Sequence, residues 1–502
     1  MTHKARGYLI ATAICMSLAG AALAQSGDVQ TKQYENGGVY EGTFKDGLQH
    51  GKGTYRLPNG YEYSGDWVEG EILGQGIARF PDGSVYEGAF AKGKPSGVGK
   101  IVFANGGTYE GEWVEGEMTG QGIANYANGV RYEGQFTNAL HDGQGTMTSP
   151  NGYIYDGSWV AGVKEGKGTI TYPDGAVYVG NLSRGQRSGQ GKLTMPDGLE
   201  YEGAWKDGQI NGLGKLKQSN GDVYEGLLVN GQRQGHGKVT YANGDIYEGA
   251  FAEDRRHGQG IFQGADGYRY EGDWLEGRIE GKGKVTYPDG SVYEGDFLAD
   301  LPHGKGKITY PDGNTYDGDW VESVIEGEGI ATYADGQVYE GSFVNAQYDG
   351  MGSMTYPDGY SYVGMWSKGV REGKGKATYT DGSVYEGNFS DGQRSGQGTL
   401  TAPSGFTYTG EWKDGEIEGK GIATYINGDI YEGTFRAGKP QGEGLMRYAT
   451  GEERTGVWED GQLIEASEPT ASAGTQDAEA ADGQAPEADG TAAAGSTETS
   501  GN

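Results

Sequence analysis

The sequence predicts an all-β fold, an elongated twisted antiparallel meander of β-hairpins that repeat every 23 residues. Three observations predict it. Equivalent tyrosines recur at this constant step, glycines recur at fixed places within it, and large and polar residues alternate in short segments between them. Such a period is typical of repeat architectures, in which each repeat packs on its neighbours rather than around one central core.

The composition supports the same fold class. Glycine supplies 99 of the 502 residues, the hydrophobic fraction is 34% and tyrosine alone reaches 36 residues. Apolar side chains are therefore few but large, which excludes a thick globular core. Abundant glycine without a three-residue period excludes collagen, and an aromatic fraction of 11% argues against a chain that lacks structure.

Each repeat starts at a tyrosine that is usually followed by Glu-Gly. Eighteen full repeats follow one another without an insertion, and a shortened nineteenth begins at Arg454. This last repeat keeps Gly456 and Trp458, and we expect it to cap the array, which spans residues 37–464. The starting tyrosines are Tyr40, Tyr63, Tyr86, Tyr109, Tyr132, Tyr155, Tyr178, Tyr201, Tyr224, Tyr247, Tyr270, Tyr293, Tyr316, Tyr339, Tyr362, Tyr385, Tyr408 and Tyr431.

Glycines and one aromatic position are constant within the repeat. Every full repeat has glycines 2, 11, 13 and 20 residues after its tyrosine. The residue four positions after the tyrosine alternates between Phe and Trp, with Leu182 and Leu228 as the non-aromatic members. Leu228 and Phe251 are consecutive members of the Phe class, so the alternation slips once. Loss of a single Trp repeat is the simplest account.

Two segments of each repeat are predicted as strands. In residues 39–45 the tyrosine, the glycine and the aromatic residue share one face, and in residues 306–310 Gly306, Ile308 and Tyr310 do so. Asp46-Gly47 and Pro58-Asn59-Gly60 supply the positive-φ positions of tight turns. A helical solenoid is rejected, because four glycines per repeat would cost roughly 3–4 kcal/mol of helix propensity.

One face of the predicted sheet is aromatic. Glycine weakens a strand unless a large ring from a neighbouring strand lies over the bare backbone, which explains why Tyr, Trp and Gly share this face. The rings either cover the glycines and one another, or part of the face stays accessible to a partner. The candidate interaction face consists of Tyr40, Trp67, Tyr109, Trp113, Trp159, Trp205, Trp274, Trp320, Trp366 and Trp412.

The repeat resembles a known family. The segment Tyr109-Glu110-Gly111-Glu112-Trp113, followed by Gly120-Gln121-Gly122, is similar to the MORN repeat (membrane occupation and recognition nexus), and the resemblance covers residues 40 to about 461. It implies a twisted sheet of hairpins that serves in scaffolding, membrane-associated organisation or oligomerisation. It implies no conserved reaction. A lipid-kinase domain, which some members carry, has no counterpart here.

The two ends differ from the array. His3, Lys4 and Arg6 precede an apolar run and a small-residue site at residues 22–24, so residues 1–24 are predicted to be a cleaved signal peptide, with a retained anchor as the alternative. Residues 25–36 form a lead-in. Residues 465–502 lack aromatic and basic side chains and are predicted to be a disordered acidic tail. Cys15 is the one cysteine, so the mature chain would have no disulfide.

No catalytic, metal or cofactor site is predicted. His257 and His303 occupy the same repeat position two repeats apart, about 19 Å by strand spacing, too far to share a metal. The Glu that follows most of the tyrosines recurs about every 10 Å in consecutive repeats, which exceeds the separation of a retaining carboxylate pair, and turn geometry explains Asp-Gly without calcium. His257, His303 and the other histidines of the array, His50, His141 and His236, are interpreted as turn residues.

A net charge of −31 lowers the expectation of nucleic acid or anionic lipid as partner. The predicted function is therefore an exported, non-enzymatic repeat scaffold in the periplasm or at the surface of a bacterial cell. Its expected partner is a protein or a second copy, with an envelope glycan or a lipid as further possibilities. The alternative is a membrane-surface protein that associates with phospholipid, and an enzyme is the third hypothesis.

Overall fold

A computed structural model describes residues 28–467, in which every regular element is a β-strand and no helix occurs. The predicted all-β hairpin repeat is thus confirmed. The predicted signal peptide and the tail from residue 468 lie outside the described residues. The described chain divides into two compact units, residues 28–313 with 319–324, and residues 314–318 with 325–467.

The strands come in two alternating lengths. The seven-residue strands start next to the repeat's tyrosine, or next to Arg454 in the last of them, and are β2 Val39–Lys45, β4 Glu62–Val68, β6 Val85–Ala91, β8 Thr108–Val114, β10 Arg131–Thr137, β12 Ile154–Val160, β14 Val177–Ser183, β16 Glu200–Lys206, β18 Val223–Val229, β20 Ile246–Ala252, β22 Arg269–Leu275, β24 Val292–Leu298, β26 Thr315–Val321, β28 Val338–Val344, β30 Ser361–Ser367, β32 Val384–Ser390, β34 Thr407–Lys413, β36 Ile430–Arg436 and β38 Glu453–Glu459.

The nine-residue strands carry the Gly-x-Gly motif and are β3 Leu48–Arg56, β5 Glu71–Arg79, β7 Lys94–Val102, β9 Glu117–Asn125, β11 Leu140–Thr148, β13 Val163–Thr171, β15 Gln186–Thr194, β17 Gln209–Lys217, β19 Gln232–Thr240, β21 Arg255–Gln263, β23 Arg278–Thr286, β25 Leu301–Thr309, β27 Val324–Thr332, β29 Gln347–Thr355, β31 Val370–Thr378, β33 Gln393–Thr401, β35 Glu416–Thr424 and β37 Lys439–Arg447. Two short strands, β1 Gln30–Gln33 and β39 Gln462–Ala466, complete the set.

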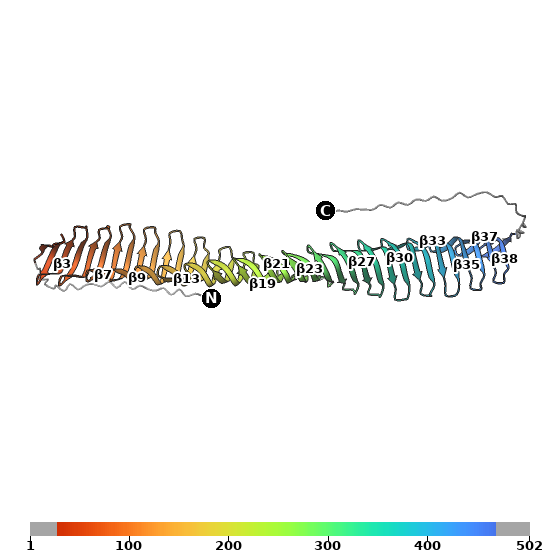
Figure 1. Ribbon diagram of the computed structural model, residues 1–502, viewed down its shortest axis with the longest axis horizontal. Coiled ribbons are helices and arrows are strands. Elements are labelled where there is room, and N and C mark those ends of the chain that lie inside the picture. Colours follow the sequence, from red (N-terminus) through yellow and green to blue (C-terminus); the bar gives the residue numbers. More distant parts are fainter. Residues whose placement is uncertain (1–27, 468–502) are drawn as a thin grey trace, which may run out of the picture. The chain divides into compact units, whose positions relative to one another are not determined.

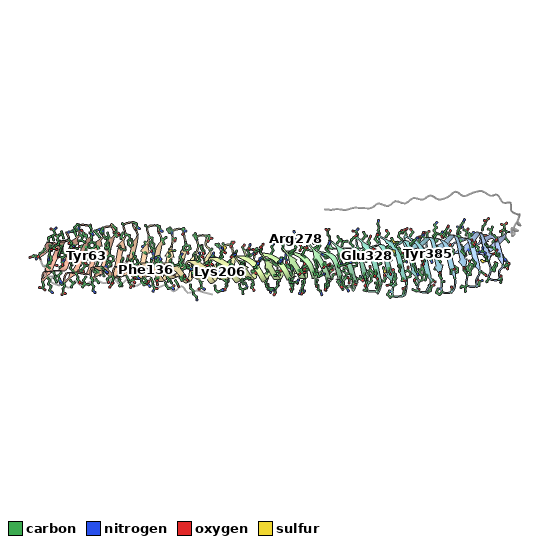
Figure 2. All side chains as sticks on the ribbon, in the orientation of Figure 1. Tyr63, Phe136, Lys206, Arg278, Glu328 and Tyr385 are labelled. Carbon is green, nitrogen blue, oxygen red and sulfur yellow. The ribbon has the colours of Figure 1, made fainter. Side chains whose placement is uncertain are left out.

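Each unit is an antiparallel meander, with successive strands side by side in chain order (Figure 1). In the first hairpin Tyr40 pairs with Tyr55 and Gly42 with Gly53, and across the next strand pair Gly53 faces Gly65. The glycines 2 and 13 residues after each tyrosine therefore form a row across the strands. Side chains stand along the strands and on the turns around Tyr63, as Figure 2 shows.

Turn chemistry explains where the strands end. Asp46 and Gly47 both adopt positive φ, 53° and 77°, as a type I′ hairpin turn requires, and this confirms the predicted turn. At the other end Gly60 has φ 93° and donates its N–H to the carbonyl of Leu57 at 3.1 Å. The Asn59 side chain accepts the N–H of Tyr61 at 3.0 Å, an Asx contact that fixes the loop.

A β-bulge recurs inside the hairpins, as in the first three. The register shifts between Gly42 and Phe44, so that Thr43 stands outside the ladder. The hydroxyl of Tyr40 donates to the Thr43 carbonyl at 3.0 Å, and in other repeats the same bond joins each tyrosine to the residue three positions on. The tyrosine ring is thereby held over the glycines of its own hairpin. The structure therefore confirms the prediction that a large ring covers the glycines.

Three details differ from the expectation or extend it. The lead-in contributes a strand, because β1 pairs with β2 and Lys32 faces Tyr40. The last strand runs to Ala466, two residues past the predicted end of the array. Tyr310 does not continue the alternation of its segment, since β25 ends at Thr309 and the ring is 36% exposed in the turn.

Candidate interaction groove

The ten residues of the predicted interaction face are buried. Their exposed fractions lie between 0% for Tyr40 and Tyr109 and 7% for Trp366, so these rings form the core of the sheet. Burial therefore favours the interpretation in which the rings cover the glycines and one another. The contact surface must be sought in the side chains that lie above them.

The buried rings form a continuous ladder in most repeats. Tyr109 contacts Trp113 of its own strand at 5.3 Å and Phe136 of the next repeat at 4.9 Å, both edge to face. This arrangement suits the quadrupoles of aromatic rings. The indole N–H of Trp113 donates to the carbonyl of Gly99 at 3.1 Å, so the ring's one polar group is satisfied. Repeats are thus joined by rings as well as by the backbone ladder.

Burial also fixes the protonation of the tyrosines. Desolvation raises the pKa of Tyr86, Tyr109 and Tyr247 to about 12, above the ordinary value of 10. Their hydroxyls therefore stay neutral at physiological pH, and each donates its proton to a backbone carbonyl. The rings serve structure, and their hydroxyl groups are committed inside the sheet.

A second layer lies directly above this core. The residue nine positions after each tyrosine pairs with the repeat's aromatic residue across the hairpin, as Ile72 does with Trp67 and Pro95 with Phe90. We call this place the groove-floor position. Most of its side chains are partly exposed, whereas Ile279, Pro302 and Pro440 are buried, so the partly exposed ones are the part of the ring face that a partner can contact. In the sequence, this layer is indicated only by the Ile or Pro that stands after the Trp or Phe within several repeats, as Ile72 stands after Trp67 and Pro95 after Phe90.

The first apolar stretch of this layer forms a cavity. It has a volume of about 860 Å³ and is lined across four successive repeats, with Trp67, Ile72, Phe90 and Pro95 among its residues. Tyr61, from the turn side, belongs to its wall. The hollow therefore runs across the strands, along the direction in which repeats follow one another, and we refer to it and its continuation as the groove.

The groove floor is apolar in some runs of repeats and basic in others. In the first unit the floor positions of five successive repeats hold Lys164, Arg187, Ile210, Arg233 and Arg256. The guanidinium of Arg187 lies 4.1 Å from the centroid of the Trp205 ring, and that of Arg256 lies 4.1 Å from the Trp274 ring. These are cation–π contacts on the aromatic core. We call the four cations the basic stretch. In the second unit Arg371 and Arg394 occupy the same position.

A smaller cavity lies within the basic stretch. Its volume is about 340 Å³, and Arg233, Arg256 and Asp254 belong to its lining. Arg233 forms an ion pair with Asp254, 3.2 Å between Nε and Oδ1. The amino group of Lys164 is instead held by the hydroxyl of Tyr153 at 2.6 Å, and burial lowers the pKa of Lys164. The groove floor thus carries positively charged hydrogen-bond donors that are partly shielded from water.

The opposite face is polar and solvated. Glutamates that follow the tyrosines pair with lysines of neighbouring strands, for example Glu110 with Lys100 at 3.4 Å and Glu225 with Lys215 at 2.7 Å. All four side chains are more than half exposed, so each pair contributes little to stability. This agrees with the interpretation of the glutamates as a solvated face rather than as paired catalytic acids.

The histidines of the described residues lie in strands and not in turns, so their prediction as turn residues is wrong: His50 is in β3, His141 in β11, His236 in β19, His257 in β21 and His303 in β25. His141 lies in β11 at the groove-floor position, stacked on Tyr132 at 3.7 Å between centroids, and its Nε2 is 2.7 Å from the hydroxyl of Tyr126. Burial lowers the pKa of His141 to about 4, so the ring is neutral at physiological pH. Within residues 28–467 no group of three His, Cys, Asp or Glu side chains could hold a metal ion.

The described residues contain no helix that is long and apolar enough to cross a membrane.

Comparisons with known proteins show what this chain is similar to. A 50-residue segment is 44% identical to Alsin of Rattus norvegicus, which is 9% of this chain and spans 3% of that protein's length. Among solved structures, the SAS-4 TCP domain of Drosophila melanogaster in complex with a proline-rich motif of Ana2 is 18% identical, with 35% of this chain and 90% of that chain covered and a TM-score of 0.21. The TCP10 domain of Danio rerio CPAP is 17% identical, covering 44% and 93%, with a TM-score of 0.20.

A sequence profile described as MORN repeat matches most of the chain. Its eighteen matches coincide with the hairpins that start at Tyr40 to Tyr431. The matched residues are 40–60, 63–85, 86–108, 109–131, 132–152, 155–177, 178–200, 201–223, 224–246, 247–267, 270–292, 293–315, 316–338, 339–359, 362–384, 385–407, 408–430 and 431–453. Sequence period, hairpin geometry and profile agree, and the chain belongs to the MORN repeat family.

Proposed function

We propose that this chain is an exported, non-enzymatic scaffold that binds a protein partner along its groove. The observation that carries the proposal is the cavity of about 860 Å³ over Trp67, Phe90 and Trp113, which four successive repeats line together. A surface shared by consecutive repeats suits an extended partner rather than a small molecule held at one point.

The arrangement of side chains supports binding rather than catalysis. The tyrosine hydroxyls are committed to backbone carbonyls, and the groove floor is built from apolar and basic side chains of one repeat position. Catalysis needs a site at which neighbouring groups differ enough to separate an acid from a base. Equivalent repeats spread contacts instead, so that many weak contacts would add up through effective concentration.

Site-specific photo-cross-linking tests the groove. A benzoylphenylalanine at Pro95 stands on the groove floor, and one at Val98, which is 67% exposed on the polar face of the same strand, is the matched control. We expect partner proteins to cross-link from Pro95 and not from Val98, and the yield to decline gradually as 23-residue repeats are deleted. Cross-links confined to Val98 would refute the role of the groove.

Export is proposed from the sequence of the first 24 residues, with cleavage before Gln25. Cell fractionation and amino-terminal sequencing of the chain expressed in a bacterium test it. We expect a mature chain that begins at Gln25 in the periplasm or at the cell surface. An unprocessed chain in the cytoplasm would contradict the proposal. Binding of the mature chain to phospholipid vesicles in flotation would favour the membrane-surface alternative instead.

A further inference from the structure

The basic stretch is unexpected in a chain of net charge −31. Its side chains are half-buried, and Arg187 and Arg256 stack on tryptophan rings at 4.1 Å. Among the residues that the structure describes, Arg233 is the member of the stretch that forms an ion pair. Lysines of the polar face, by contrast, repeatedly have a carboxylate within reach, as Lys215 has Glu225.

Packing alone does not require these cations. The same repeat position is occupied by Ile72, Ile279 and Ile417, which pair with tryptophan in the same register as Arg187 pairs with Leu182. An apolar side chain therefore fits the place. Arg187 and Lys164 donate to uncharged acceptors, the Gly208 carbonyl at 2.8 Å and the Tyr153 hydroxyl at 2.6 Å. Partial burial of a charge without an opposite charge is unfavourable, and an acidic group brought by a partner would offset that cost.

The spacing of the cations defines the shape of such a partner. Successive repeats are two strands apart, about 9.6 Å at the usual strand separation. A polyproline II helix has three residues per turn and rises about 3.1 Å per residue, so one of its edges recurs about every 9.3 Å. Over the four repeat steps from Lys164 to Arg256 the accumulated mismatch is on the order of 1 Å. Every third residue of an extended ligand would thus meet one repeat.

We propose that the basic stretch binds an acidic polypeptide segment in the polyproline II conformation, with an acidic residue at every third position and an apolar residue opposite Ile210. The expected pattern is acidic-x-x-acidic-x-x-apolar-x-x-acidic-x-x-acidic, for Lys164, Arg187, Ile210, Arg233 and Arg256 in turn. This inference rests on the proposed function, because it assigns the chemistry of the partner to one stretch of the same groove.

The charge distribution favours a peptide over a nucleic acid. Duplex DNA carries a charge about every 1.7 Å of its axis, far denser than one cation per repeat, and the acidic surface of the chain would repel it. In an acidic peptide with two uncharged residues between successive carboxylates, each carboxylate would meet the one cation that a repeat places on the groove floor. Carboxylates also suit the planar guanidinium groups of Arg187, Arg233 and Arg256.

Fluorescence anisotropy of labelled synthetic peptides with the full chain tests the inference. One thirteen-residue peptide repeats Glu-Pro-Pro with Leu at its centre, and a second has the same composition with its glutamates contiguous. We expect the first to bind at least about tenfold more tightly. Equal affinity of the two peptides, or tighter binding of a single-stranded oligonucleotide or a sulfated glycan, would overturn the proposal. Absent peptide binding together with self-association of the chain would overturn it as well.

Two triple variants of equal charge locate the site. Arg187→Gln, Arg233→Gln and Arg256→Gln together remove three cations of the floor, and we expect at least about a tenfold loss of affinity. The control, Lys192→Gln, Lys215→Gln and Lys238→Gln, removes three exposed cations of the polar face from the same region. We expect less than about a threefold loss for it.

A second variant guards against a folding effect. Replacing the three arginines by lysine keeps the charge and loses the planar guanidinium, so we expect an intermediate affinity with an unchanged circular-dichroism spectrum. An equal loss in the floor and control variants would refute the assignment. If the peptides fail to bind while partner cross-links from Pro95 persist, the proposed function stands and this inference falls. If both fail, the proposed function falls too.

Discussion

Glu280 of one hairpin accepts a hydrogen bond from the backbone N–H of Ala299 in the turn of the next hairpin, at 3.1 Å. Ala299 has φ 49°, so the carboxylate stabilises a turn residue in the left-handed region. The contact recurs at the same separation of 19 residues in Glu165–Arg184, Glu326–Asn345, Glu372–Asp391 and Glu418–Ala437. It links successive hairpins independently of the backbone ladder, and it explains why Glu follows the groove-floor position so often.

Replacing Glu280 with Ala should loosen this turn. The lost bond is charge-assisted but exposed, so we expect a local loss of about 1 kcal/mol. Amide hydrogen exchange of Ala299 measures it, with about fivefold faster exchange expected in the variant. Glu294→Ala is the matched control, since Glu294 lies on the polar face, 71% exposed and 3.8 Å from Lys284. Equal exchange at Ala299 in both variants would show that Glu280 does not stabilise the turn.

The glycine row should tolerate no side chain. A Cβ on Gly283 would stand 2.7 Å from Cζ of the buried Tyr270 ring, which cannot move without losing its place over the backbone. We expect Gly283→Ala to lower the free energy of unfolding by about 3 kcal/mol. Gly267→Ala is the control, because Gly267 faces open space but has φ 96°. Only backbone strain of roughly 1–2 kcal/mol is expected there.

Urea unfolding followed by circular dichroism compares the two variants. The prediction fails if Gly283→Ala costs no more than Gly267→Ala, because the tyrosine ring would then yield to an added methyl group.

The repeat pattern was enough to predict the hairpins, the turns and the covering of glycine by tyrosine, because each follows from spacing and from local backbone geometry. It left open whether the rings are accessible. The answer depends on the side chain nine residues after each tyrosine, such as Ile72 over Trp67, and this residue changes from repeat to repeat. Alternation shows which residues share a face, whereas the layer that closes the face depends on cross-strand register.

The basic stretch was missed for a related reason. Arg187 and Arg256 look like ordinary surface cations in a sequence with 40 basic residues, and nothing local places them on tryptophan rings of the following repeat. A turn position is predicted for His141 because this residue lies close to a turn in sequence. Its stacking on Tyr132 follows from the register between β10 and β11, in which Phe136 faces His141.

Acid should destabilise the repeat that contains His141. Burial lowers its pKa to about 4 in the folded chain, below the ordinary value of 6.5. The folded state therefore resists protonation, so this contribution to stability is complete above pH 6.5 and is lost as the pH falls towards 4. Allowing for partial exposure, we expect about 2 kcal/mol.

The variant His141→Phe keeps a stacked ring and cannot titrate. Urea unfolding of both chains at several pH values isolates the histidine, because other titrating groups cancel in the difference. We expect the difference in unfolding free energy to change between pH 6.5 and 4 and to stay constant above that range. A difference that does not vary with pH would contradict the buried, neutral imidazole.

Alkaline pH should unfold the array cooperatively. Burial raises the pKa of tyrosines such as Tyr86, Tyr247 and Tyr408 to about 12, whereas tyrosine in an unfolded chain titrates near 10. A raised pKa means that the folded state holds its proton, so the stability is complete below pH 10 and falls as the pH rises through 10 towards 12.

The losses add up, because each repeat contributes a tyrosine in an equivalent place. One such residue contributes up to about 2 kcal/mol over this range, and successive repeats depend on one another through the ring ladder. Tyrosinate absorbance and circular dichroism should therefore change together in one steep transition above pH 10. A gradual rise in tyrosinate absorbance over an unchanged β-sheet spectrum would mean that the rings ionise in place, and that the tyrosines do not form the buried core on which the hairpins depend.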